Sequence, residues 1–148
     1  LMRKALGAAL GLKELRILDE DSGMGGIGTL PAPLGLQEYY AWVKAALGLE
    51  ALRTNHVTGD RVIRKVAFCG GSGKSFLQKA MDAADLFLTG DLTYHSYENG
   101  VFFNFPMADI GHHASEAPGM KALAGDLAVG LGIRTSYLES GDFSTVKL

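Results

Sequence analysis

Apolar residues recur at helical spacing in four parts of the chain. Residues three and four positions apart lie on one face of a helix, which then packs against a core. A glycine follows each of the first two stripes and is placed to end the helix. The stripes are Met2, Ala5, Leu6, Ala9 and Leu10, closed by Gly11; Leu36, Tyr39, Tyr40, Val43 and Leu47, closed by Gly48; Phe76, Leu77, Ala80, Met81 and Ala84; and Met120, Leu123 and Leu127.

Shorter apolar runs between these stripes predict β-strands. Strand, helix, strand, helix and strand follow one another between residues 62 and 105, which is typical of an α/β sheet with helices on its faces. Residues 19–35 are rich in Gly, Asp and Pro and are expected to be mostly irregular. A short helix is expected through "DLTYHSYENG", with Asp91 near its beginning. The predicted strands read "ELRIL", "ALRTNHV", "VIRKVAFC", "DLFLTG", "VFFNF", "MADIG" and "IRTSYL".

Three loops are expected to lie together at one edge of this sheet. Loops that leave the carboxyl ends of strands gather there, and α/β proteins place their sites among them. The loops at residues 70–75, 89–95 and 111–116 qualify, and they also hold the polar side chains that could carry chemistry. The sequence therefore predicts a site where these loops converge.

Composition and charge narrow the classes of function. The 148 residues suit one domain, 47% of them are hydrophobic and 20% charged, and the net charge is −2, so nothing indicates a nucleic-acid partner. No apolar run has the length of a membrane span. The single cysteine, Cys69, fits a reducing, cytoplasmic compartment. Because Cys69 lies in an apolar strand, we expect its thiol to be buried and unreactive rather than to act as a catalytic nucleophile.

The segments "GHHASE" and "TGDLTYH" contain candidate site residues. His112 and Glu116 lie four residues apart, so both point the same way on a helix, and an imidazole with a carboxylate suits zinc, manganese or iron. The alternative is a helix-capping or surface pair. Asp91 and His95 have the same spacing and could act near a metal as an orienting carboxylate and a general acid or base. Otherwise Asp91 caps a helix and His95 is solvated.

Two glycine-rich segments superficially suggest nucleotide binding. In "VAFCGGSGKSF", a P-loop would need a glycine where Phe68 stands, and the turn from Gly70 to Gly73 is short for wrapping a phosphate. The competing explanation is backbone geometry, because glycines allow sharp reversals and close approaches. In "GMGGIGTLPAP", no strand directly precedes the glycines and no helix follows them, so a dinucleotide-binding fold is not indicated.

Taken in order, these segments resemble those of one family. "GMGGIGTLPAP" is followed by an amphipathic helix and then by "VAFCGGSG", "DLFLTGDLTYH" and "GHHASE". This order is similar to that of the NIF-three-like proteins, also called GTP cyclohydrolase 1 type 2 homologues, over residues 6–137. The resemblance implies an α/β fold in which a mixed sheet is flanked by helices. It also implies a dinuclear metal site at the loops that follow the carboxyl ends of the strands.

The resemblance further implies which residues hold the metals. His112 and Glu116 match ligands of the family, whose other ligands, a His-His pair and an Asp, lie in its N-terminal half. No His-His pair precedes position 112, and the chain opens with Leu1. Residues 1–148 are therefore expected to be the C-terminal part of such a protein, in which a complete subunit holds two divalent ions of zinc, iron or manganese. The closing "ESGDFSTVKL" lacks a Pro expected of the family.

Two functions from different classes follow. The first is a metal-dependent hydrolase-like protein acting on a small molecule, with His112 and Glu116 as ligands and His95, oriented by Asp91, as acid or base. The family name implies ring opening of GTP, although no residue here selects a purine. The second is a non-catalytic, ring-like homo-oligomer that serves as a scaffold or a regulatory protein-binding module. An intact N-terminal half would favour the enzyme, and its natural absence the scaffold.

Overall fold

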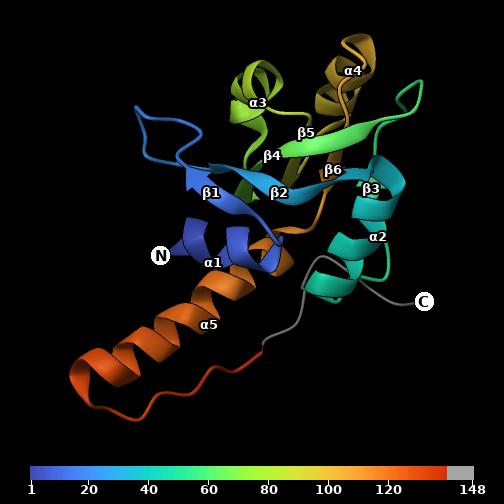
Figure 1. Cartoon of the computed structure of the whole chain (residues 1–148). Coiled ribbons are helices and arrows are strands. Elements are labelled where there is room, and N and C mark those ends of the chain that lie inside the picture. The colour runs from blue at the N-terminus through green and yellow to red at the C-terminus, as the bar shows by residue number, and fades with distance from the viewer. Residues whose placement is uncertain (140–148) are drawn as a thin grey trace.

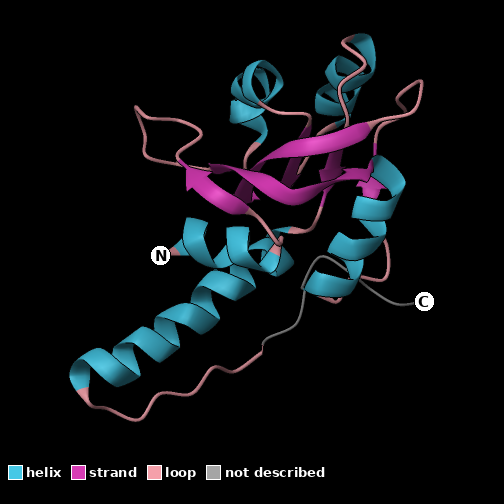
Figure 2. Cartoon of the chain, in the orientation of Figure 1, coloured by secondary structure: helices cyan, strands magenta, loops and turns pink. Residues whose placement is uncertain are grey.

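The computed structural model describes residues 1–139 and shows a six-stranded sheet with helices on both faces (Figures 1 and 2). The strands lie in the order β1-β2-β4-β5-β6-β3. In chain order the elements are α1 (Met2–Ala9), β1 (Lys13–Arg16), β2 (Gly26–Gly35), α2 (Leu36–Leu47), β3 (Arg53–Thr54), β4 (Val62–Ser72), the 3-10 helix η1 (Lys74–Phe76), α3 (Leu77–Ala83), β5 (Leu86–Gly90), α4 (Tyr94–Phe102), β6 (Met107–Asp109) and α5 (His112–Leu131).

A parallel unit forms the centre of the sheet. β4 pairs with β5 and β5 with β6 in parallel, and the connecting helices α3 and α4 lie on the same face (Figure 1). The pairs β1–β2, β2–β4 and β3–β6 are antiparallel, so the sheet is mixed. The predicted alternation of strands and helices is confirmed from β4 to α4, with β6 rather than residues 101–105 as its last strand. It places the three candidate loops at the carboxyl ends of parallel strands.

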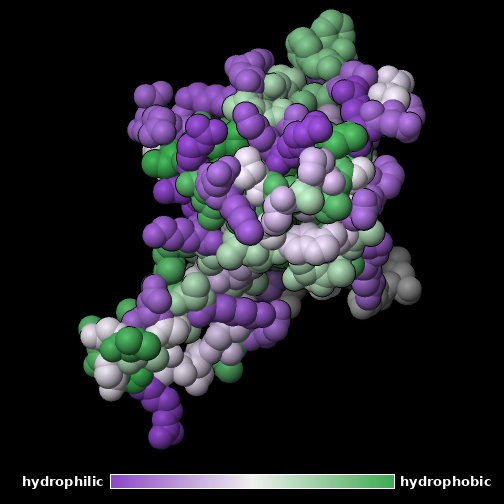
Figure 3. Space-filling view, in the orientation of Figure 1, coloured by the Kyte–Doolittle hydropathy of each residue, from purple (hydrophilic) through white to green (hydrophobic). Residues whose placement is uncertain are grey.

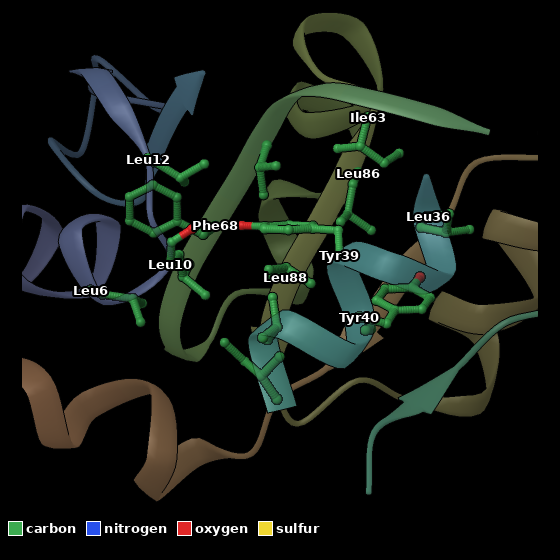
Figure 4. Packing of buried hydrophobic residues seen from close by; sticks show 14 residues of the cluster. Leu6, Leu10, Leu12, Leu36, Tyr39, Tyr40, Ile63, Phe68, Leu86 and Leu88 are labelled. Atoms are coloured by element: carbon green, nitrogen blue, oxygen red, sulfur yellow. Dashed lines mark hydrogen bonds between the residues drawn. The ribbon is translucent and has the colours of Figure 1, made fainter. Parts of the chain in front are cut away.

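An apolar core lies on each face of the sheet, because successive strand residues point to opposite faces. Val66 and Phe68 of β4 pack with residues of α1 and α2, whereas Ala67 packs on the side of α3. Figure 4 shows Tyr39 in the first of these cores. The Tyr39 hydroxyl is buried and donates a hydrogen bond of 2.9 Å to the carbonyl of Leu10, so its polar atom is satisfied inside the core.

Residues 19–35 are more regular than expected, because their second part forms strand β2. Pro31 and Pro33 lie between Thr29 and Leu34, where the pairing of β2 with β4 is interrupted. Proline has no N–H group to donate to a neighbouring strand, and both prolines stand where the hydrogen bonding between β2 and β4 is already interrupted. The expectation was wrong because Gly and Pro can mark an interrupted strand as well as a loop.

Several shorter strand predictions also need correction. "VFFNF" forms no strand: Val101 and Phe102 belong to α4, and Asn104 follows in a left-handed conformation with φ 50°. The third parallel strand is β6 instead, within the predicted "MADIG". "ALRTNHV" contributes only β3. Residues 133–138 ("IRTSYL") form a loop with Ile133 and Leu138 exposed, since strand propensity needs a partner strand to act on. Of "ESGDFSTVKL", residues 140–148 lie outside the described part.

The four predicted helical stripes fall on helices, except that Leu10 and Ala84 directly follow α1 and α3 and Phe76 lies in η1. Gly11 and Gly48 follow α1 and α2 with φ of 68° and 66°, a conformation that favours glycine at helix ends. α5 begins earlier than its stripe indicated, at His112, and projects away from the sheet (Figure 1). Among the helices of residues 1–139, none is both long and apolar enough to cross a membrane.

Candidate functional site

The three loops predicted to converge do meet in the structure. Thr89, buried at the end of β5, accepts a hydrogen bond of 2.8 Å from the N–H of Gly73 and donates one of 3.2 Å to the carbonyl of Gly71. The N–H of Gly71 donates to Oγ of Ser115 in α5 at 2.9 Å. One threonine and one serine thus connect the ends of β4 and β5 to the beginning of α5.

The glycines of this region allow backbone segments to approach closely. β4 extends to Ser72, which pairs with Gly90, so most of the turn expected after Cys69 is strand. A Cβ on Gly90 would lie 2.7 Å from the backbone nitrogen of His112 and 2.8 Å from the carbonyl oxygen of Gly71. Side chains are therefore excluded where β4, β5 and α5 meet. Backbone geometry, rather than a phosphate-binding loop, accounts for these glycines.

His112 lies between two carboxylates at the beginning of α5. Its Nδ1 is 2.6 Å from Oδ2 of Asp91, and its Nε2 is 3.5 Å from Oε1 of Glu116, one helical turn further on. Asp91 has φ 55°, a left-handed conformation that Asp and Asn adopt more readily than most residues. The predicted approach of His112 and Glu116 on one helix face is confirmed. Asp91, which was expected to orient His95, contacts His112 instead.

Two side-chain donor atoms, Nε2 of His112 and Oε1 of Glu116, lie against a glycine. Gly71, with φ 66°, lies against both donors: a Cβ there would be 2.7 Å from Oε1 of Glu116 and 3.2 Å from Nε2 of His112. A carboxylate on the other ring nitrogen is a common way to orient a metal-binding imidazole. Residues 1–139 contain no group of three or more His, Cys, Asp or Glu side chains that could hold a metal. His112 and Glu116 offer two donor atoms of the kinds that zinc, iron and manganese take as ligands.

His95 lies apart from this arrangement. Its side chain is 84% exposed in the first turn of α4, and its Nδ1 is 3.2 Å from Oε2 of Glu98. The expected pair with Asp91 is not formed, and the helix is capped by Thr93, whose hydroxyl accepts the N–H of Ser96. Spacing of four residues brings side chains together only when both residues are helical, and Asp91 precedes the helix. An acid or base role for His95 stays a prediction.

Two other residues complete the description of the site. Cys69 is buried, as expected, and its burial raises the pKa of the thiol, which disfavours the nucleophilic thiolate. Ser115 was missed by sequence reasoning. Its hydroxyl accepts the N–H of Gly71 and donates to the carbonyl of His112 at 2.8 Å. Its position inside "GHHASE" was the only signal that could have pointed to it.

The fold and site define an α/β protein with a histidine between two carboxylates at the carboxyl edge of its parallel strands. Residues 2–139 match the family model described as Duf34/NIF3 (NGG1p interacting factor 3). Because this match covers most of the chain, the chain belongs to the Duf34/NIF3 family. The resemblance inferred from the segment order is thereby confirmed.

Curated relatives with the name GTP cyclohydrolase 1 type 2 homolog share part of this sequence. The protein from Escherichia coli (strain K12) is 40% identical over 101 residues, which are 65% of this chain and 38% of that protein. The protein from Streptococcus pneumoniae serotype 4 is 35% identical over 111 residues, 70% of this chain and 42% of that protein. The chain thus spans less than half the length of these relatives.

Solved structures share the fold. The structural-genomics protein ybgI, described as of unknown function, superposes with a TM-score of 0.85 at 25% identity, over 95% of this chain and 56% of that one. A Bacillus cereus protein related to NIF3 gives a TM-score of 0.67 at 25% identity, over 83% of this chain and 35% of that one. The observed mixed sheet with flanking helices is therefore the fold of these neighbours.

Proposed function

We propose that this chain supplies part of the divalent-metal site of a hydrolase-like protein, with His112 and Glu116 as ligands. The observation that carries the proposal is the arrangement around His112: Asp91 at 2.6 Å from one ring nitrogen, and Glu116 at 3.5 Å from the other. Asp91 acts on the metal through His112, because its carboxylate holds the ring in one orientation. Gly71 keeps the space at the two donor atoms open.

Two ligands are fewer than the three or four that hold a zinc ion firmly. The proposal therefore includes further ligands from outside this chain, and the greater length of its relatives supports this part. It also includes two zinc, iron or manganese ions in each complete subunit. A bound divalent ion supplies Lewis acidity that polarises a carbonyl or phosphoryl oxygen and activates water. The names of the relatives make GTP the first substrate to test. A cytoplasmic location belongs to the same proposal and is supported by the lone, buried cysteine.

Metal binding by purified protein tests this proposal directly. The chain is dialysed against increasing Zn²⁺, Mn²⁺ or Fe²⁺, and bound metal is measured by elemental analysis. We expect the native chain, which supplies two ligands, to bind metal weakly and the His112→Ala/Glu116→Ala double variant to lose this binding. The matched control is His95→Ala/Glu98→Ala, which removes the same side-chain types from the exposed pair on α4 and should bind like the native chain. Equal binding by all three proteins would overturn the proposal.

A second candidate function is supported by the surface of α5. Five large apolar residues of this helix, which projects from the sheet, are exposed: Met120, Leu123, Leu127, Val129 and Leu131, with Val129 exposed by 88%. Figure 3 shows apolar side chains at the far end of this projection. Exposed apolar groups of this kind mark contact surfaces. A homo-oligomeric, ring-like scaffold would use such a surface, and its assembly, measured by sedimentation velocity, would persist in the His112→Ala/Glu116→Ala variant.

A further inference from the structure

A cavity of about 460 Å³ lies beside Glu116, one of the two candidate metal ligands. Glu116 and Ser115 line one side of it, and the first turn of α1 lines another, with Arg3 and Lys4. The loop that precedes β2 and the end of β4 complete the wall. Its volume is within the range of small-molecule sites, which are several hundred Å³. The cavity therefore connects Glu116, one of the two candidate ligands, to a space that a substrate could fill.

The packing of α1 on α5 fixes the position of these cationic residues. Gly119 of α5 leaves no room for a side chain, because Met2 of α1 occupies that space. Gly70 lies between the two helices: a Cβ there would be 3.8 Å from Leu6 and 3.3 Å from the carbonyl oxygen of Ser115. α1 is consequently held against α5, with Met2 opposite Gly119 and Leu6 near Ser115, in the turn of α5 that carries the candidate ligands.

Arg3 is held over the loop by its own contacts. A Cβ on Gly26 would lie 2.8 Å from Cγ of Arg3, so the stem of the arginine packs on this glycine. Its Nη1 donates a hydrogen bond of 3.3 Å to the carbonyl of Gly23. An arginine with a positioned stem loses less conformational freedom when its guanidinium binds a ligand.

The positive charge of this wall is not neutralised within residues 1–139. The ion pairs of that part of the chain do not include Arg3 or Lys4, whereas Lys79, for comparison, pairs with Asp19 and Asp21. Glu116 is the one acidic residue of the described chain that lines the cavity. Two cations beside a single carboxylate favour a ligand with more than one negative charge.

We propose that this cavity binds the phosphate group of a small-molecule substrate, with Arg3 as the principal contact and Lys4 as the second. A phosphate carries about two negative charges and matches the planar donors of an arginine. Leu6, Met24 and Phe68 form an apolar wall for the rest of the molecule. This inference rests on the proposed function, because the bond to be hydrolysed would lie at the end of the cavity formed by Glu116.

Calorimetric titration of the metal-free chain tests the phosphate contact without any metal. Pyrophosphate, inorganic phosphate and acetate are titrated in EDTA at one fixed ionic strength, because salt screens such contacts. We expect pyrophosphate and phosphate to bind more tightly than acetate, and Arg3→Gln to weaken pyrophosphate binding by about tenfold or more. The matched control is Arg64→Gln, an equal loss of charge at an exposed residue of β4 outside the cavity, with a change of less than about twofold.

The outcomes separate this inference from the proposed function. If Arg3→Gln binds pyrophosphate as tightly as the native chain, or acetate binds as tightly as phosphate, the phosphate site is overturned whatever the metal titration shows. The metal-free His112→Ala/Glu116→Ala variant should keep or strengthen pyrophosphate binding, because it lacks the one carboxylate on the wall. If the native chain binds pyrophosphate but takes up no metal in the dialysis experiment, the proposed metal site alone is overturned. Circular dichroism of each variant checks that it is folded.

Discussion

Two histidine–carboxylate contacts lie close together in the sequence but in different settings. His112 lies at the meeting point of three loops, with its ring nitrogens 2.6 Å from Asp91 and 3.5 Å from Glu116. His95 lies on the outer side of α4, 3.2 Å from Glu98, with 84% of its side chain exposed. Both contacts join a histidine to a carboxylate, so the difference in their surroundings comes from the helices, strands and loops that carry the residues.

The first contact is built across the fold, whereas the second is local. His95 and Glu98 are three residues apart on one helix, and exposed pairs of this kind contribute about 0.2–1 kcal/mol. Asp91 and His112 are 21 residues apart, and the backbone beside them is fixed by the close approach of Gly90 to the backbones of His112 and Gly71. Donors that are already in place lose little freedom when a ligand binds. The comparison therefore predicts that only the pair at the loop junction affects metal binding.

The largest effect is expected at Gly71. The substitution Gly71→Ala places a Cβ 2.7 Å from Oε1 of Glu116 on a backbone with φ 66°. We expect metal affinity to fall by more than about a hundredfold, beyond the range for groups that only orient a ligand. The free energy of unfolding should also fall by about 1–2 kcal/mol because of the left-handed backbone. Metal titration with elemental analysis and urea unfolding measure these two effects.

Gly48 provides the matched control for this substitution. It has the same φ of 66°, but a Cβ there meets nothing within 4 Å. Gly48→Ala should therefore lose the same stability, about 1–2 kcal/mol, and keep its metal affinity. Equal metal affinity in the two variants would mean that the space at Gly71 does not affect metal binding by His112 and Glu116. The contrast between His112 and His95 would then not depend on Gly71.

Much of the fold was predictable because the spacing of apolar residues indicates which face of each helix or strand is buried. The run that includes Val66 and Phe68 alternates between two cores, and such a run predicts a strand in any setting. β2 was not predictable in this way, since Pro31 and Pro33 are tolerated only where its pairing is interrupted. The strand expected over residues 101–105 failed because the cap at Thr93 begins a helix that includes the first of those residues.

The site was predictable only as far as its contacts are local. His112 and Glu116 lie on one helix, so spacing alone indicated that they face the same way. The contact between Asp91 and His112 depends on how β5 and α5 are placed relative to each other, which no local pattern contains. Ser115 was missed for the same reason, since its partner, Gly71, belongs to a distant strand.

An intermediate effect is expected at Asp91. Asp91→Asn keeps the size of the side chain and suits the left-handed backbone at φ 55°, so it mainly removes the charge that holds His112. Metal affinity should fall by about 10- to 100-fold. Glu98→Gln removes the same charge from the exposed pair and serves as the control, with unchanged affinity. A competition titration with a chromophoric chelator resolves both values, and equal losses in the two variants would contradict a specific role for Asp91.

The smallest effect is expected at His95. His95→Gln removes an imidazole whose partner, Glu98, lies on the same exposed face of α4, so the free energy of unfolding should change by less than about 0.5 kcal/mol. Metal affinity, measured by the same chelator competition, should stay within about twofold, because such exposed pairs contribute little. A tenfold loss would show that α4 closes over the metal and brings His95 to His112. His95 would then lie near the metal, as the spacing of Asp91 and His95 in the sequence predicts.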